Sequence, residues 1–269
     1  MKFNMQCGCA RPAPPIFKSA GQAKLIDRDR QTIRKARLKL KATIKKFLKA
    51  KAPDIARQVI AAKDSAEKAT VEILARVLAA LDLGDWDSLS DEIKPLIETI
   101  LRDAGAEALV QIGITDSGIT ELVNDRAVKY AEQRAAELVT RISESTREML
   151  RADIAEAMRD GWSNDTLADA ISDNYAFSPD RAETIARTET AYADVAGNMA
   201  AYRESGVVEQ KKWITGAGCC DLCDELDGVT IDLDDDFDTE DGPIDGPPYH
   251  PNCRCDVSPV LKDDGNGSD

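Results

Sequence analysis

The stretch "AGNMAAYRESGVVEQKKWIT", residues 196–215, changes its hydrophobic period at Gly206. Before this glycine, small and apolar residues such as Ala196 and Met199 recur at the spacing of a helix face. After it, residues 207–215 alternate in character and carry residues that favour strands. Glycine commonly ends a helix. The stretch therefore predicts a helical body that is followed by a small module of strands.

Helix patterns dominate the chain before this boundary. Hydrophobic residues, many of them alanine, make up 43% of the 269 residues, aromatic residues 5% and charged residues 31%. Such a mixture favours helix over sheet. We expect a basic amphipathic helix over 20–52, a helical segment over 53–116 in which Pro53 starts a new helix, and a helical core over 117–206.

Local capping signals divide the helical core. A long helix is predicted from about 117 to 159, and Gly161 follows at a position suited to ending it. Ser163 is suited to cap a short helix directly after it. Ser178 is a natural N-cap for a further helix, with Pro179 in its first turn. The core is therefore expected to contain three helices of unequal length.

Two further strand candidates, 228–234 and 255–261, follow the boundary and flank an acidic loop rich in glycine and proline. We place the strand module at 207–262 and treat 1–19 and 263–269 as tails. The predicted fold class is mainly α. It consists of a helical body with long helices and a small C-terminal module of strands and loops. A Cys/His metal site is expected to hold this module together.

The metal site is predicted from five cysteine and histidine residues. Cys220 and Cys223 form a C-x-x-C pair, and His250 and Cys253 form an H-x-x-C pair, with Cys255 as an alternative fourth ligand. Two such pairs are typical of a tetrahedral structural zinc site. Thiolate and imidazole ligands favour zinc over hard cations. Metal binding would stabilise strands that are too short to build a core alone.

Other uses of these residues stay open at this point. A redox C-x-x-C pair, a disulfide and unligated thiols are alternatives, and Cys219 is a spare cysteine. Catalytic zinc is disfavoured, because the sequence lacks an H-x-E or H-E-x-x-H motif and its single histidine is used as a ligand. A calcium loop starting at Asp232 or Asp234 lacks the required glycine and glutamate.

Charge is distributed unevenly along the chain. The formal net charge is −14, which argues against a protein that coats nucleic acid with its whole surface. The predicted helix over 20–52 is nevertheless basic. It either contacts nucleic-acid phosphates or an acidic protein surface, or it is a solvated amphipathic helix. The candidate contact residues are Arg34, Lys35, Arg37, Lys39, Lys41, Lys45, Lys46 and Lys49.

The sequence also predicts where the protein is made. Its first residues, "MKFNMQCGCARPAPP", lack the apolar region of a signal peptide, and no stretch approaches the roughly 18 apolar residues of a membrane span. We expect synthesis in the cytoplasm, where thiols stay reduced. Clustered cysteines then indicate a metal more than disulfides.

Four segments in a fixed order resemble a known family. They are "RAETIARTETAYADVAGNMAAY" (181–202), "KKWIT" (211–215), "CDLCDELDG" (220–228) and "PPYHPNCRCDVSPV" (247–260). The set resembles the phage head morphogenesis family, the Mu F-like minor head proteins, over about 130–260. The helix and strand residues that belong to this pattern are Arg187, Thr188, Glu189, Thr190 and Trp213.

The resemblance implies a minor capsid protein of the virion that acts with the portal protein and other head proteins in head assembly, DNA packaging or DNA ejection. It implies no enzymatic activity and no membrane in the assembly role. The basic helix would touch packaged DNA or an acidic portal surface. The Arg187–Thr190 motif would either contact a partner or, as we favour, hydrogen-bond the helix to the terminal module. A metal-dependent DNA-processing enzyme and a nucleic-acid-binding module are the alternatives.

Overall fold

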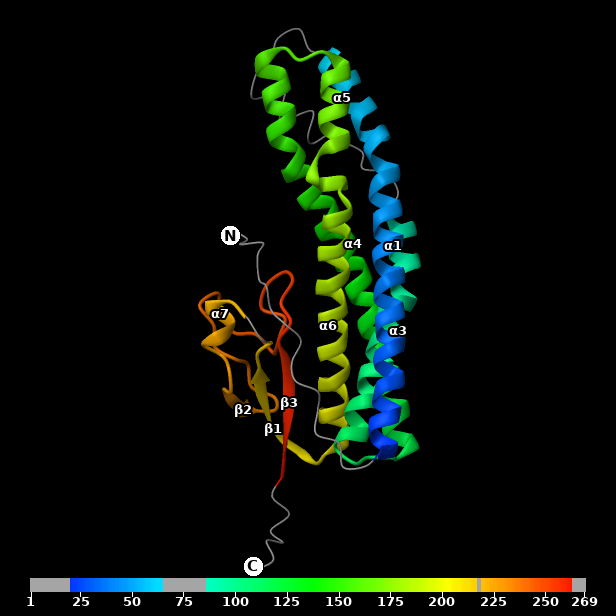
Figure 1. The fold of residues 1–269 in the computed structure, drawn as a ribbon, viewed down its shortest axis with the longest axis vertical. Coiled ribbons are helices and arrows are strands. Elements are labelled where there is room, and N and C mark those ends of the chain that lie inside the picture. Colours follow the sequence, from blue (N-terminus) through cyan, green and yellow to red (C-terminus); the bar gives the residue numbers. More distant parts are fainter. Residues whose placement is uncertain (1–19, 65–85, 217–218, 263–269) are drawn as a thin grey trace, which may run out of the picture. The chain divides into compact units, whose positions relative to one another are not determined.

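The computed structural model describes residues 20–64, 86–216 and 219–262, so both expected tails lie outside the described residues (Figure 1). The fold is mainly α with a small antiparallel sheet, as predicted. The helices are α1 (Ala20–Asp64), α3 (Asp87–Gln111), α4 (Ser117–Asp160), α5 (Asn164–Asp173), the 3-10 turn η1 (Tyr175–Phe177), α6 (Pro179–Ser205) and α7 (Asp221–Asp224). The strands are β1 (Val208–Ile214), β2 (Thr230–Asp232) and β3 (Asp256–Leu261).

The described residues divide into two compact units. The sheet unit lies within Met1–Leu38, Pro95–Glu132 and Thr184–Asp269, and the helical unit lies within Lys39–Lys94 and Gln133–Glu183. Each unit is described by itself below. In the described ranges, no helix combines the length and apolar character needed to cross a bilayer.

The expected helix boundary at Pro53 is wrong. Helix α1 continues through this proline to Asp64. Proline in a helix interior removes one backbone hydrogen bond and costs about 3 kcal/mol. Here apolar residues on both sides of it, Leu48 and Ile55 among them, are at most 1% exposed. Their burial on one continuous stripe offsets the cost of the proline, which local sequence rules do not take into account.

The predicted helix ends are confirmed where local side chains determine them. The backbone N–H groups of Thr166 and Arg181 donate to the hydroxyls of Ser163 and Ser178, each at 3.1 Å. Both serines thus satisfy donors that the first turn of a helix leaves unpaired. At Gly206 the backbone has a φ of 67°, the left-handed conformation that favours glycine, and α6 ends directly before it.

A buried arginine organises the core of the helical unit. The Arg181 side chain, 3% exposed, donates to the carbonyl oxygens of Ala176 at 2.7 Å and Ile142 at 3.0 Å. It also donates to the hydroxyls of Thr146 at 2.8 Å and Ser145 at 2.7 Å. Burial lowers the pKa of Arg181 to about 10, so the guanidinium stays charged at neutral pH. One side chain therefore links α4, η1 and α6.

Replacing this arginine is expected to destabilise the helical unit. In Arg181→Met, buried oxygens of Ala176 and Thr146 lose their donor, and each unsatisfied group costs about 1–3 kcal/mol. We expect a loss of about 2–4 kcal/mol in the free energy of unfolding, measured by urea denaturation. The control is Arg151→Met, whose side chain is 57% exposed and pairs with Glu148; it should change stability by less than about 0.5 kcal/mol. Equal effects of the two substitutions would contradict the role of Arg181.

The three strands form one antiparallel sheet in the order β2-β1-β3. On the central strand, Lys211 lies opposite Ile231 of β2 and Pro259 of β3. The register against β3 shifts between Val208 and Gln210, as in a β-bulge. This shift lets Val208 be buried on the same strand as Lys211, although simple alternation would not allow it. All three strand candidates of the sequence are confirmed.

The sheet packs against the C-terminal part of α6 in the core of the sheet unit. Trp213 of β1 is fully buried, and its ring meets that of Phe237 at 5.1 Å in an edge-to-face arrangement. Met199 and Tyr202 of α6 belong to the same buried cluster, together with three of the C-terminal cysteines. The core of this unit therefore extends from the helix, through the sheet, to the predicted metal ligands.

Candidate metal centre

Two tight turns carry the predicted ligands. Cys220 lies directly before α7 and Cys223 lies within it, and the backbone N–H groups of Cys223 and Asp224 donate to the Cys220 carbonyl at 3.0 Å. In the second turn, the Cys253 N–H donates to the carbonyl of His250 at 3.1 Å. Each turn thus presents two ligand side chains on the same side, as the two spacings predict.

The structure brings the ligand atoms of both turns together. The Nε2 atom of His250 lies 3.1 Å from Sγ of Cys220 and 3.3 Å from Sγ of Cys223, and Sγ of Cys223 lies 3.7 Å from Sγ of Cys253. A tetrahedral zinc with metal–sulfur bonds of about 2.3 Å places sulfurs about 3.8 Å apart. The Cys223–Cys253 distance therefore matches the edge length of a tetrahedral site.

Cys223 is common to two groups of ligand atoms. It forms one group with Cys220 and His250 and a second with Cys253 and Cys255, and the ligand atoms in each group lie within 4.8 Å of one another. The sequence leaves open whether Cys253 or Cys255 is the fourth ligand, and the structure keeps both within that distance of Cys223. The residues offer four thiols and one imidazole, a soft donor set that fits a zinc ion.

The histidine is oriented for metal binding. Its Nδ1 atom lies 2.9 Å from the carbonyl oxygen of Pro251. A carbonyl oxygen only accepts, so Nδ1 carries the proton and the lone pair of Nε2 faces the sulfurs of Cys220 and Cys223. The hydrogen bond from Nδ1 to Pro251 fixes the tautomer of the ring, as is usual for histidine ligands of metals.

Crowding of the three buried thiols shifts their pKa values in opposite directions. A hydrogen bond to Cys253 raises the pKa of Cys223, and the same bond lowers the pKa of Cys253 to about 2. Cys223 also lowers the pKa of Cys255, but the hydrogen bond to Cys253 and burial outweigh this effect and raise it to about 12. Deprotonation of one of these thiols disfavours deprotonation of the others, whereas a divalent cation would stabilise several thiolates at once.

One residue of the predicted helix motif supports the second turn. The Thr188 hydroxyl of α6 accepts from the backbone N–H of Asn252 at 3.0 Å, and Asn252 has a φ of 62°. Asparagine tolerates this left-handed conformation better than most residues. Thr188 therefore makes the hydrogen bond between helix and terminal module that the sequence favours for this motif. Asn252 has no specific signal in the sequence that assigns it this role.

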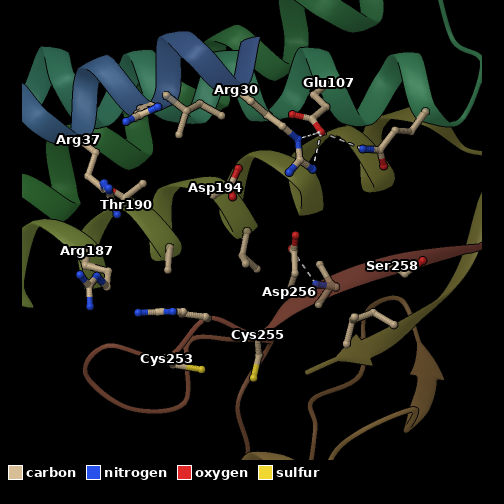
Figure 2. A pocket seen from close by; sticks show the side chains of 18 of the residues that line it. Arg30, Arg37, Glu107, Arg187, Thr190, Asp194, Cys253, Cys255, Asp256 and Ser258 are labelled. Carbon is tan, nitrogen blue, oxygen red and sulfur yellow. Dashed lines mark hydrogen bonds and ion pairs between the residues drawn. The ribbon is translucent and has the colours of Figure 1, made fainter. Parts of the chain in front are cut away.

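The remaining motif residues have different surroundings. Glu189 is 5% exposed and Trp213 is fully buried, so both are part of the packed interior. Arg187 and Thr190 line a pocket beside Cys253 (Figure 2). The motif residues thus lie in three places. Thr188 is at the second ligand turn, Glu189 and Trp213 are in the packed interior, and Arg187 and Thr190 line the pocket.

The predicted basic contact residues on α1 also separate into groups. Arg34 and Arg37 line the same pocket as Arg187. Lys41 pairs with Glu183 at 2.8 Å. The others are exposed on α1, and they are Lys35, Lys39, Lys45, Lys46 and Lys49. The structure therefore leaves the amphipathic character of the helix intact, with its apolar stripe buried.

A buried lysine that the sequence did not single out connects the acidic loop to the sheet. The Nζ atom of Lys211 is fully buried and donates to the carboxylate and, at 2.7 Å, to the backbone carbonyl of Asp245. Arg203 donates to the same carboxylate at 2.8 Å. Burial raises the pKa of Asp245, but the hydrogen bonds from Arg203 and Lys211 outweigh burial and hold it below its ordinary value.

Removal of this carboxylate is expected to destabilise the sheet unit in a pH-dependent way. In Asp245→Ala the buried ammonium of Lys211 loses its counter-charge. Breaking a buried pair costs about 3–5 kcal/mol, and we expect about 2 kcal/mol because Asp245 is 49% exposed. A lowered folded-state pKa stabilises the fold above the unfolded value of about 4 and ceases to do so as the pH falls through the folded value.

The difference between wild type and Asp245→Ala should therefore be full at neutral pH and should shrink at about pH 3 and below. Urea denaturation at both pH values measures it. The control is Asp236→Ala, an exposed acid of the same loop, for which no comparable loss is expected at either pH. A difference for Asp245→Ala that grows as the pH falls would have the wrong sign for this ion pair.

Comparisons with known proteins identify one family. Residues 148–258 match the family described as "Phage Mu protein F like protein", so the resemblance expected from the sequence is confirmed over this range. "Uncharacterized protein YqbB" from Bacillus subtilis (strain 168) is 24% identical over 190 residues, which cover 65% of this chain and 62% of that protein. The chain thus spans less than two thirds of the length of this relative. No solved structure matches the chain.

Proposed function

Because residues 148–258 belong to the phage Mu protein F-like family, we propose that this chain is a non-enzymatic minor head protein that acts in head assembly at the portal vertex. The family indicates a phage head morphogenesis protein and hence a component of the virion. The observation that carries the proposal is that the family match ends within β3 and includes both ligand turns and all of α6. The matched range thus includes a folded module of helix, strands and ligand turns, which suits a protein that binds partners.

Structural zinc is the second part of the proposal. Cys220, Cys223 and His250, with Cys253 or Cys255, would hold the ion. Bound zinc would cross-link the turn that contains α7 to the turn that precedes β3. The strands joined in this way have three to seven residues each. Such short strands bury little apolar surface, so metal binding would supply much of their folding free energy.

The proposed zinc is structural because of its surroundings. Cys223, Cys253 and Cys255 are each at most 4% exposed. A catalytic zinc keeps one coordination position for water or substrate. Here the protein offers five donors for four positions, and three of them are buried. This donor set supports a role in shaping a surface and speaks against a metal-dependent DNA-processing enzyme.

The exposed face of α1 is the proposed contact with the head. Lysines such as Lys45, Lys46 and Lys49 are exposed there in a chain of formal net charge −14. A local basic face on an acidic protein selects a negatively charged neighbour. We propose that this neighbour is an acidic portal surface or packaged DNA, with a role in packaging or ejection.

Co-purification with the portal protein tests this function. Tagged full-length chain, produced together with portal and head proteins, is expected to be retained on assembled heads and to carry about one zinc per chain by elemental analysis. A charge-reversed variant, Lys45→Glu with Lys46→Glu and Lys49→Glu, is expected to lose retention but keep its zinc. Multiple turnover on DNA by the purified chain, or absence from heads that contain portal protein, would overturn the proposal.

A further inference from the structure

A pocket of about 310 Å³ in the sheet unit is lined by residues of both ligand turns and of the acidic loop between β2 and β3. Leu222 of the first turn forms part of one wall, and Tyr249, which directly precedes His250, forms part of another. The third wall is the loop tip 238–240. The turns that hold the candidate metal ligands therefore also shape this pocket.

The loop tip is anchored by a pair of backbone hydrogen bonds. The N–H of Phe237 donates to the carbonyl of Ile244 at 2.8 Å, and the N–H of Ile244 donates to the carbonyl of Phe237 at 3.0 Å. Phe237 is also fully buried, with its ring against that of Trp213. Asp238 and Glu240 follow this anchor and line the pocket from a fixed loop, so less conformational entropy is lost when a ligand binds.

Three carboxylates line the pocket, those of Glu225, Asp238 and Glu240, and all three residues are exposed. In the described part of the chain, none of these carboxylates forms a hydrogen bond or an ion pair, and no lysine, arginine or histidine lines the pocket. Like charges around one pocket repel each other, and a bound cation would relieve this repulsion. The pocket is therefore suited to a positively charged ligand.

The spacing of the carboxylates disfavours a bare metal ion. Among the described residues, only the two cysteine-containing groups bring three ligand atoms within 4.8 Å of one another, so the three carboxylates form no such group. An ammonium group reaches carboxylate oxygens at about 2.7–2.9 Å, compared with about 2.0–2.6 Å for magnesium or calcium, and it does not require several ligands at once. An organic cation therefore fits this pocket better than a metal does.

The rest of the lining favours a ligand with an apolar part. Leu222 is 39% exposed, so a ligand that covers it would gain from burial of apolar surface. The hydroxyl oxygen of Tyr249 is buried and has no hydrogen-bond partner among the described residues. An unsatisfied buried hydroxyl is unfavourable, and an N–H donor of a ligand at this wall would satisfy it.

We infer that the pocket binds a lysine side chain from a basic segment of a partner protein. A lysine has an apolar stem, which would cover Leu222, and a compact ammonium group with three donors, which would lie among the three carboxylates. An arginine fits less well, because its planar guanidinium is matched by one carboxylate in a side-by-side pair. The inference rests on the proposed function, in which the strand module shapes a surface for partners.

Fluorescence anisotropy of the purified full chain with a fluorescein-labelled peptide of alternating lysine and leucine tests this inference. We expect Glu225→Gln with Glu240→Gln to lower the affinity at least about tenfold, because the ammonium loses charged acceptors. The matched control, Asp235→Asn with Asp236→Asn, removes the same charge from exposed positions of the acidic loop that do not line the pocket. It should change the affinity less than about twofold.

A second pair of variants tests the apolar wall. Leu222→Ala is expected to lower the affinity at least about threefold, because it removes apolar surface that the lysine stem would cover. Its control is Val229→Ala, since Val229 is 37% exposed in the same module and does not line the pocket; it should change the affinity less than about twofold. Circular dichroism checks the fold of each variant, and if one decisive variant does not fold, the other pair decides.

Three results would overturn the inference. The first is that the peptide does not bind wild type at low salt. The second is that the controls lose as much affinity as the decisive variants, which would indicate diffuse attraction to an acidic surface. The third is that the peptide binds only by dissociating oligomers of wild type in analytical ultracentrifugation, which would assign the pocket to a second copy of the chain.

These assays need no portal protein. Failure of this inference is therefore distinguishable from failure of the proposed function, which co-purification with the portal protein tests.

Discussion

Serine in place of Cys223 is expected to abolish binding of the proposed zinc and to unfold residues 207–262, while Cys219→Ser leaves both unchanged. Cys223 is fully buried and belongs to both groups of ligand atoms, so its loss disables the site whether Cys253 or Cys255 is the fourth ligand. Structural zinc contributes an apparent binding free energy of about 10–16 kcal/mol at neutral pH. This is as large as the whole stability of a typical domain, about 5–15 kcal/mol.

Elemental analysis and hydrogen exchange measure the two parts of this expectation. Cys223→Ser should have no stoichiometric zinc and should lose amide protection in β1 and β3, whereas amides of α4 and α5 stay protected. Cys219 is the matched control because it is a neighbouring, partly exposed cysteine that belongs to neither group of ligand atoms and whose thiol donates to Asp224 at 3.6 Å. The proposed structural metal would be refuted if a metal-free chain retained full amide protection over 207–262. It would also be refuted if both variants lost zinc equally.

Leucine in place of Gly197 is expected to disrupt the sheet unit. At this position α6 approaches α3 so closely that a Cβ atom would lie 2.4 Å from the carbonyl oxygen of Leu101 and 2.8 Å from Cβ of Ala104. The backbone cannot yield as a flexible side chain can. Overpacking costs about 1–3 kcal/mol in ordinary cores and more where backbone must move. We expect Gly197→Leu to cost more than about 3 kcal/mol.

Gly197→Ala should cost less than Gly197→Leu, because alanine adds only a Cβ atom at this close contact, whereas leucine adds three further carbon atoms. The control is Gly118→Ala in the first turn of α4, where the nearest atom to the new Cβ belongs to the Asp116 side chain, at 3.1 Å. Urea denaturation of the three variants measures the differences. If Gly197→Leu is no less stable than Gly118→Ala, the close approach of α3 and α6 does not limit stability.

Local chemistry made several elements predictable. Ser163 and Ser178 cap helices at the expected positions because a serine hydroxyl reaches an N–H group only three residues away. The change of period at Gly206 marks the step from α6 to β1 for a similar reason. The boundary at Pro53 failed, since the stability of α1 there depends on burial of Leu48 and Ile55. Local rules do not measure burial.

The candidate site shows the same division. The spacing of Cys220 with Cys223, and of His250 with Cys253, indicates ligand pairs because each pair is set by one turn. Which side chains then support or neighbour these pairs depends on distant segments. The Thr188 hydroxyl accepts a hydrogen bond from the N–H of Asn252, although the two residues are 64 positions apart in the sequence. A local sequence pattern does not indicate a contact over this distance.

By itself, the sequence determined the helical and strand segments, the two ligand turns and the family of residues 148–258, because each of these depends on residues close in sequence or in a fixed order. Only the tertiary structure decided that Cys223 connects two ligand groups, that Lys211 is buried against Asp245, and that arginines of α1 and α6 line one pocket. These features arise from long-range packing, in which burial and charge are set by neighbours that the local pattern does not encode.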